Sequence, residues 1–314
     1  MTIASKLLLL VALAGCLSNA YAEKKNILII RGVSTHSKDS HNNDEVGLLI
    51  KSKLEKSKYA DQFDVVTTMN YPEDLSLVEN ADLIIISSDG GIKHALANPG
   101  DQTKHTSHLD GVLKKNKTGV IVIHWATDAP SDKFGELHPE NSKKMMDWIG
   151  AVYYWVDKSK DPKSSWTWKF PVLELKVDKT HPISNGVAGT FKLQDEYYFN
   201  FFTEADGRNP GSDKETFLHT AHAPSHRSDM NNKRDQACYW SFVREGGGRS
   251  VAMTSAHMYH TWANPHFFQS FANSIFWTLN LQVPESGVDI ATPTLEELLE
   301  IGDTRIYKMA RHFK

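Results

Sequence analysis

The chain has almost no cysteine, which excludes a disulfide framework. Its 314 residues contain only Cys16 and Cys238. Cys16 lies in an N-terminal segment that is expected to be processed, so one thiol remains in the mature chain and no intrachain disulfide is expected. The stability of the protein must therefore come from the packing of its core.

Long apolar runs are also missing. Lys6 precedes the apolar run Leu7–Leu13, which is too short to cross a bilayer, and no later run reaches that length. A short positive stretch followed by such a run is typical of a secretory signal. Residues 1–22 therefore predict a signal peptide, and we expect no transmembrane span.

Two processing routes stay open at this end of the chain. Ala20-Tyr21-Ala22 matches a cleavage site that would leave Glu23 as the first residue. Leu13-Ala14-Gly15-Cys16 resembles a lipobox, which would anchor the protein through a lipid on Cys16. The first route is favoured because only a short tether separates Cys16 from the first predicted strand. Both routes predict export, to the periplasm or medium or as a lipoprotein.

Charge of one sign does not dominate. The 35 Lys and Arg residues nearly balance the 38 Asp and Glu residues, and the formal net charge is -3. A dedicated nucleic-acid-binding protein would carry a strongly basic face, so nucleic acid is not expected as a partner. The pattern does not define an oligomeric state.

What the sequence does contain is an alternation of apolar strands and amphipathic helices. The strands are expected at residues 26–31, 63–69, 81–87 and 118–124, and the helices at 44–56, 105–116 and 141–150. Strands buried on both faces and alternating with helices are typical of a doubly wound parallel sheet. We therefore expect a flavodoxin-like α/β fold.

The second half of the chain is less regular. Residues 151–245 are expected to form an elaborated, partly β insertion that covers one end of the sheet. A strand at 237–243, a Gly246-Gly247-Gly248 turn, a strand at 249–255 and a helix at 265–279 follow. The predicted α/β domain spans residues 23–283, and residues 284–314 form a linker-like tail with a short helix at 295–301.

Polar residues gather where the predicted strands end. In open α/β sheets, ligands bind at the carboxyl ends of the strands, so these residues are expected to form one site. They are His36 and His41 after the first strand, Asp89 after the third, His124, Trp125 and Asp128 after the fourth, and His257, His260 and Trp262 after the last.

Two adjacent carboxylates add to this set. Asp195 and Glu196 lie among aromatic residues, and partial burial would raise a carboxyl pKa toward values that suit acid–base catalysis. The alternative is a solvated strand end with one carboxylate in an ion pair.

These motifs resemble those of the ThuA-like (trehalose utilization) family. The resemblance rests on segments 122–128, 193–198, 247–249 and 254–257, and on Trp262 and the terminal helix up to Trp277. The loop from Arg31 to His41 and the tail around 292–298 are similar to an exported bacterial subgroup. The similarity covers nearly all of the mature chain.

The resemblance implies a fold like that of class I glutamine amidotransferases, which carry a nucleophilic cysteine on a sharp turn after a central strand. Here that turn holds His124-Trp125, and Cys238 lies inside an apolar strand. Buried thiols are usually inert, so cysteine-dependent amidotransferase chemistry is not expected.

Two histidines and a carboxylate match the ligands of a catalytic divalent metal such as zinc. His124, Glu196 and His257 are the candidate ligands, and a metal-free His–carboxylate acid–base site remains the alternative. The candidate catalytic residues are His124, Asp195, Glu196 and His257. The candidate substrate-binding residues are His36, His41, Asp89, Trp125, Asp128, His260 and Trp262. The glycine turn at 246–248 precedes a strand rather than a helix, so no nucleotide cofactor is expected.

The resemblance further implies a carbohydrate-active enzyme whose partner is a small sugar or keto-sugar. Hydrolysis and proton abstraction next to a sugar carbonyl both fit such a site. The alternative is a non-catalytic sugar-binding or assembly protein of the cell envelope.

Overall fold

The computed structural model describes residues 23–36, 40–97, 102–132, 138–153, 165–201, 215–222 and 235–302. The predicted signal peptide, including Cys16, lies outside these residues, as does the end of the tail. Among the helices of the described residues, none is long and apolar enough to span a membrane.

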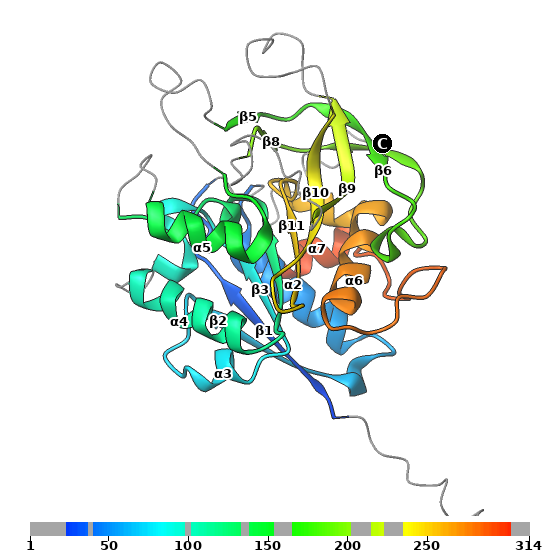
Figure 1. The fold of residues 1–314 in the computed structure, drawn as a ribbon. Coiled ribbons are helices and arrows are strands. Elements are labelled where there is room, and N and C mark those ends of the chain that lie inside the picture. Colours follow the sequence, from blue (N-terminus) through cyan, green and yellow to red (C-terminus); the bar gives the residue numbers. More distant parts are fainter. Residues whose placement is uncertain are drawn as a thin grey trace, which may run out of the picture.

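Five parallel strands form one side of a nine-stranded sheet (Figure 1). They lie in the order β2-β1-β3-β4-β11, and each neighbouring pair is parallel. This is the flavodoxin-like order, so the predicted fold class is confirmed. The strands are β1 (Lys25–Arg31), β2 (Phe63–Met69), β3 (Leu83–Ser87), β4 (Gly119–Ile123) and β11 (Arg249–Met253).

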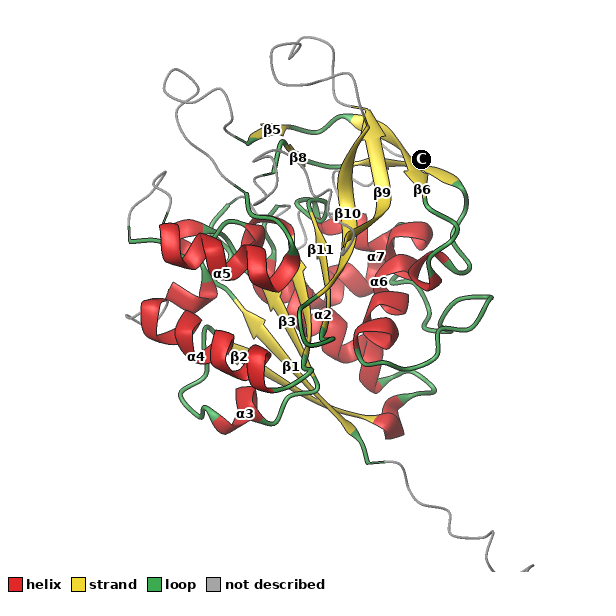
Figure 2. Ribbon diagram, viewed as in Figure 1, coloured by secondary structure: helices red, strands yellow, loops and turns green. Residues whose placement is uncertain are grey.

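Both faces of this sheet are buried because successive residues of its strands alternate between two cores. Ile27 and Ile29 belong to one core, and Leu28 and Ile30 belong to the other. Helices cover each face (Figure 2). On one side lie α2 (Asn43–Glu55), α6 (Pro265–Thr278) and α7 (Leu295–Ile301); on the other lie α3 (Ser76–Glu79), α4 (Gln102–Lys115) and α5 (Pro139–Ile149).

The insertion extends the sheet with antiparallel strands. Next to β11 lie, in order, β10 (Asp235–Val243), β9 (Glu215–His222), β6 (Val172–Val177) and β7 (Thr190–Gln194). A separate two-stranded sheet pairs β5 (Trp166–Trp168) with β8 (Tyr197–Phe199). In Figure 1, β5 and β8 lie beyond the carboxyl ends of the parallel strands. The insertion thus both widens the sheet and adds chain at the end where a site is expected.

The turn between β10 and β11 is a hairpin, as predicted. Gly246 and Gly247 both have a φ of 90°, a backbone conformation that residues other than glycine rarely adopt.

The tail packs on the domain, whereas the sequence predicted a linker before its helix. Val288 and Ile290 are buried in the core, and the Asn273 side chain accepts a hydrogen bond from the Val288 backbone N–H at 2.8 Å. Lys53 on α2 pairs with Glu297 on α7 at 3.1 Å. Residues 284–301 are therefore part of the folded unit.

Candidate functional site

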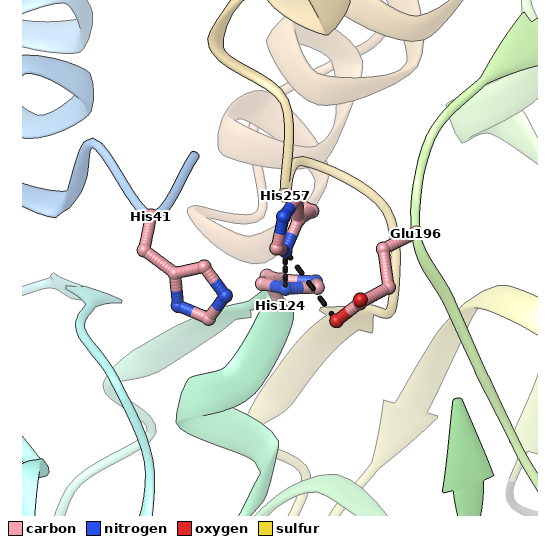
Figure 3. Close-up of side chains that lie close together, drawn as sticks. All are labelled: His41, His124, Glu196 and His257. Carbon is pink, nitrogen blue, oxygen red and sulfur yellow. Dashed lines mark hydrogen bonds and ion pairs between the residues drawn. The ribbon is translucent and has the colours of Figure 1, made fainter. Parts of the chain in front are cut away.

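Four buried side chains converge at the carboxyl ends of the parallel strands. His41, His124, Glu196 and His257 each offer one ligand atom, and these four atoms all lie within 4.8 Å of one another. Figure 3 shows them meeting from four separate segments. His41 follows β1, His124 follows β4, Glu196 precedes β8 and His257 follows β11. The structure thus brings together the three predicted metal ligands and adds His41.

The backbone is strained at three of these segments. His41, His124 and Ala256, which precedes His257, have φ values of 51°, 53° and 82°. Non-glycine residues rarely occupy this region, and such strain clusters at functional sites. His124 opens the turn η4 (His124–Thr127), where the Thr127 hydroxyl donates to its carbonyl at 2.7 Å. The sharp turn predicted at His124 is therefore present.

The hydrogen bonds of His124 define its tautomer. Its Nδ1 donates to the carbonyl of Thr254 at 2.5 Å. The other nitrogen, Nε2, is then a bare acceptor that lies 3.2 Å from Nδ1 of His257 and receives the Tyr198 hydroxyl at 2.9 Å. Burial, followed by the neighbouring charges of His41 and His257, holds the pKa of His124 well below its ordinary value. The imidazole is therefore neutral and presents a lone pair to the group.

Glu196 supplies the negative charge of the group. One carboxylate oxygen, Oε1, lies 3.4 Å from Nδ1 of His257. Burial alone would raise the pKa of Glu196, but the hydrogen bond and charge of His257 outweigh burial and lower it. The carboxylate is therefore ionised at neutral pH.

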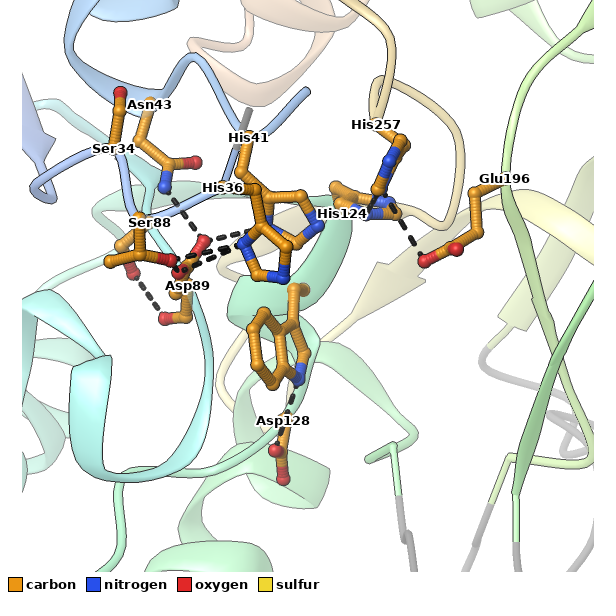
Figure 4. A network of polar contacts seen from close by, with 12 residues as sticks. Ser34, His36, His41, Asn43, Ser88, Asp89, His124, Asp128, Glu196 and His257 are labelled. Atoms are coloured by element: carbon orange, nitrogen blue, oxygen red, sulfur yellow. Dashed lines mark hydrogen bonds and ion pairs between the residues drawn. The ribbon is translucent and has the colours of Figure 1, made fainter. Parts of the chain in front are cut away.

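A second buried carboxylate lies behind His41 (Figure 4). Asp89 Oδ1 accepts from Nδ1 of His41 at 2.6 Å and from the Asn43 amide at 2.9 Å, and Thr35 donates to Oδ2. Burial opposes ionisation of Asp89, yet the hydrogen bonds from His41, Thr35 and Asn43 lower its pKa. Burial lowers the pKa of His41, although Asp89 opposes this shift. Asp89 has no exposed surface, so it contacts His41 rather than solvent.

His36 and Trp125 lie at the outer side of the group. The His36 ring is partly exposed and stacks on His41 with ring centroids 3.9 Å apart. The half-buried Trp125 ring meets His36 and His41 edge-on, with centroids at 5.6 and 5.3 Å. Its Nε1 donates to Asp128 at 3.2 Å, and burial raises the pKa of Asp128 to about 7.

Asp195 does not join the group, although the sequence predicted it as a catalytic carboxylate. Its two oxygens accept from the backbone N–H groups of Glu196, Ala256 and Met258 at 2.8, 2.6 and 3.0 Å, and from the Thr261 hydroxyl at 2.9 Å. Burial raises its pKa to about 6. Asp195 therefore anchors the loop that carries His257.

Two further predicted residues lie outside the group. Trp262 is fully buried and packs edge-on against Phe267 and Phe271, so the structure places it in the core beside α6. His260 is half-buried in the turn η7 (Tyr259–Ala263) and is not one of the four converging side chains.

Tyr198 also lies at the site, although it is not among the residues that the sequence predicted there. Its ring stacks on His124 with centroids 4.5 Å apart. The signal was available, because residues two apart on an extended chain face the same side, and Glu196 and Tyr198 are two apart.

Cys238 lies in the core, as expected. It is fully buried in β10, and burial raises the pKa of its thiol. Because Cys238 is not among the converging side chains, the site contains no thiol nucleophile within the described residues.

The residues present fit a divalent metal. Neutral imidazoles and an ionised carboxylate are the ligands that zinc and similar ions take. His124 and His41 each donate the remaining ring N–H to a carbonyl or carboxylate, which is how ligating histidines are oriented in metal sites.

Comparisons with known proteins identify the fold. No protein-family model and no curated protein sequence matches the chain. The structure is similar to that of a ThuA-like protein from Bacteroides uniformis ATCC 8492, with a TM-score of 0.57, 14% identity, and coverage of 84% of this chain and 95% of that one. The predicted resemblance is thus confirmed for the fold.

Two weaker similarities involve larger or different proteins. A β-galactosidase from Rahnella sp. R3 matches at a TM-score of 0.47 and 10% identity, over 81% of this chain and 31% of that one. PurLQS from Thermotoga maritima matches at a TM-score of 0.41 and 10% identity, over 82% of this chain and 98% of that one.

Proposed function

We propose that this protein is a metal-dependent enzyme, related to ThuA-like proteins, that acts on a sugar or keto-sugar. One observation carries the proposal: three buried imidazoles and a buried carboxylate converge at the strand ends, with their ligand atoms within 4.8 Å of one another. Clusters of buried titratable groups with shifted pKa values are typical of functional sites, and imidazoles with a carboxylate are a ligand set that divalent ions take.

His124, His257 and Glu196 would hold the ion, as their sequence positions suggested. When bound, a divalent ion at this place would polarise a substrate oxygen or activate a water molecule. The carbonyl of Thr254 keeps Nε2 of His124 available for the ion, and Asp195 keeps the His257 loop in place.

Substrate would contact the exposed side of the group. His36 and Trp125 are the partly exposed side chains there, and they suit hydrogen bonding to hydroxyl groups and stacking on a sugar face. The Tyr198 hydroxyl lies 2.9 Å from Nε2 of His124 and would donate to an oxygen bound beside it. Support for the sugar class comes from the resemblance to the ThuA-like family.

We further propose that the protein is exported. Support comes from Lys6 and the apolar run that follows it, with cleavage after Ala22 favoured over lipidation of Cys16. Mass spectrometry of the processed protein distinguishes a chain that starts at Glu23 from a lipidated one that starts at Cys16.

The test is metal content and turnover of the purified mature protein. We expect one divalent ion per chain, lost in His124→Ala and His257→Ala but retained in His222→Ala, which removes an exposed histidine outside the group. Turnover is screened on trehalose, other disaccharides and their keto derivatives, and we expect it to follow the ion.

Two results would contradict the proposal. A folded wild-type chain that takes up no ion would exclude the metal and favour metal-free acid–base catalysis. An ion-loaded chain that binds sugars without turning any of them over would favour the sugar-binding protein.

A further inference from the structure

His41 is not accounted for by a site of two histidines and one carboxylate. Its ligand atom lies with those of His124, Glu196 and His257, within the same 4.8 Å. The His41 ring meets those of His257 and His124 edge-on, with centroids 4.5 and 4.9 Å away. It is as buried as the other three residues.

We propose that His41 is a fourth ligand and that Asp89 is the positioning residue that fixes the orientation of the His41 ring. This inference rests on the proposed metal site. The site would then hold its ion with three imidazoles and one carboxylate. Neither residue would contact the substrate directly.

The orientation of His41 follows from its partner. A carboxylate can only accept hydrogen bonds, so the 2.6 Å contact requires Nδ1 of His41 to carry the proton and donate it to Asp89. Nε2 is then left with its lone pair. In Figure 3 the His41 ring points a nitrogen toward His124 and His257.

Asp89 is itself held in place. Asn43, the first residue of α2, donates to Oδ1 at 2.9 Å, and Thr35 donates to Oδ2. Asp89 has no exposed surface and lies two residues after the end of β3 at Ser87. A carboxylate bonded on both oxygens cannot rotate, so it fixes the plane and tautomer of the imidazole.

The backbone also ties His41 to another ligand. Its N–H donates to the carbonyl of His257 at 3.0 Å, and Ser40 forms an isolated antiparallel bridge with Met258. This pairing sustains the strained φ of 51° at His41. The loops that carry His41 and His257 are therefore joined before any ion arrives, as a preformed site requires.

A fourth ligand changes which ion suits the site. Catalytic zinc keeps one of four positions open, and three imidazoles with one carboxylate would fill all four. A substrate oxygen then needs a fifth or sixth position, which favours ions such as Mn²⁺, Fe²⁺, Co²⁺ or Ni²⁺, or an expanded zinc centre.

The test measures Co²⁺ and Zn²⁺ affinity of the mature protein by competition with a chromogenic chelator. His41→Gln and Asp89→Asn are compared with His222→Gln, which replaces an exposed histidine outside the group. We expect Asp89→Asn to weaken binding about 10- to 100-fold, His41→Gln at least as much, and His222→Gln less than about 3-fold. The visible spectrum of the Co²⁺-loaded wild type should be weak, as for five or six ligands, and should intensify in His41→Gln.

Other outcomes separate this inference from the proposed function. If Asp89→Asn and His41→Gln bind as tightly as the wild type while His124→Ala binds no ion, the metal site stands and the inference is wrong. If the wild type binds neither ion, both are wrong. Should His41→Gln fail to fold, the isosteric Asp89→Asn variant decides, with unfolding in chelator as the check on its fold.

Discussion

At the scale of single residues, the adjacent carboxylates Asp195 and Glu196 lie in different surroundings. Asp195 accepts two backbone N–H groups and one hydroxyl from the segment that carries His257, and Glu196 faces the converging imidazoles. Residues next to each other on an extended chain point to opposite sides, so this separation follows from local geometry. One carboxylate supports the loop, and the other belongs to the site.

This division predicts different costs for two isosteric changes. In chelator, Asp195→Asn should lower the free energy of unfolding by roughly 3 kcal/mol, because its amide group opposes N–H donors that lose their acceptor. Glu196→Gln should lower it by less than about 1 kcal/mol, since the neutral amide can still bond His257, but it should abolish ion binding. Urea unfolding and metal titration measure the two effects. A stable Asp195→Asn variant that binds the ion yet lacks turnover would instead indicate that Asp195 takes part in the chemistry.

At the scale of elements, the parallel half of the sheet could be predicted because its strands are apolar throughout. Ile27 to Ile30 face two cores, and this pattern is legible without knowing which strands pair. The predicted limits of β2 and α7 match the observed ones, at Phe63–Met69 and Leu295–Ile301.

The insertion could not be predicted in the same way. Strands β6 and β7 do alternate buried and exposed residues, but alternation indicates a strand and not its neighbour. The pairing of β6 with β9 depends on contacts between residues far apart in the sequence, such as Lys176 and Thr220.

The same distinction applies to the site. Histidines at strand ends were expected to meet because the carboxyl ends of parallel strands lie at the same edge of the sheet. His41, His124 and His257 do meet there. The hydrogen-bond partners of Asp195 could not be anticipated. They depend on the conformation of residues 256–261, and these residues follow Asp195 by more than sixty positions in the sequence.

The turn after β4 offers a test of strain at the site. At a φ of 53°, a side chain with a Cβ costs about 1 kcal/mol relative to glycine. In chelator, His124→Gly should therefore unfold at a higher free energy than His124→Ala by about that amount, while both lose the ion. Equal free energies of unfolding for the two variants would show that the positive φ at position 124 does not destabilise the folded state.

At the scale of the whole molecule, several histidines are buried far from solvent as neutral groups. Burial lowers the pKa of His94 to about 4 and that of His219 to about 3, against an ordinary value of 6.5. His219 bonds the Ser270 hydroxyl at 2.9 Å in the core between β9 and α6, with no carboxylate partner among the described residues to favour its charged form.

These histidines should make the fold sensitive to acid. Between pH 6.5 and about 3, the unfolded chain binds a proton at position 219 that the folded chain excludes, so the free energy of unfolding falls as the pH falls. The contribution is up to about 1.4 kcal/mol per pH unit for each such histidine. The loss sets in below pH 6.5 and is absent above it.

His219→Gln should remove the contribution of His219 to the pH dependence of the free energy of unfolding. From pH 6.5 to 5.0, the free energy of unfolding of the variant should fall by about 1.6 kcal/mol less than that of the wild type, because glutamine does not titrate. Urea unfolding in chelator measures this without interference from metal release. His222→Gln, which replaces an exposed histidine on the same strand, is the matched control for the change from histidine to glutamine. A wild-type slope in His219→Gln would mean that the folded protein admits a proton at His219, and that its acid sensitivity arises elsewhere.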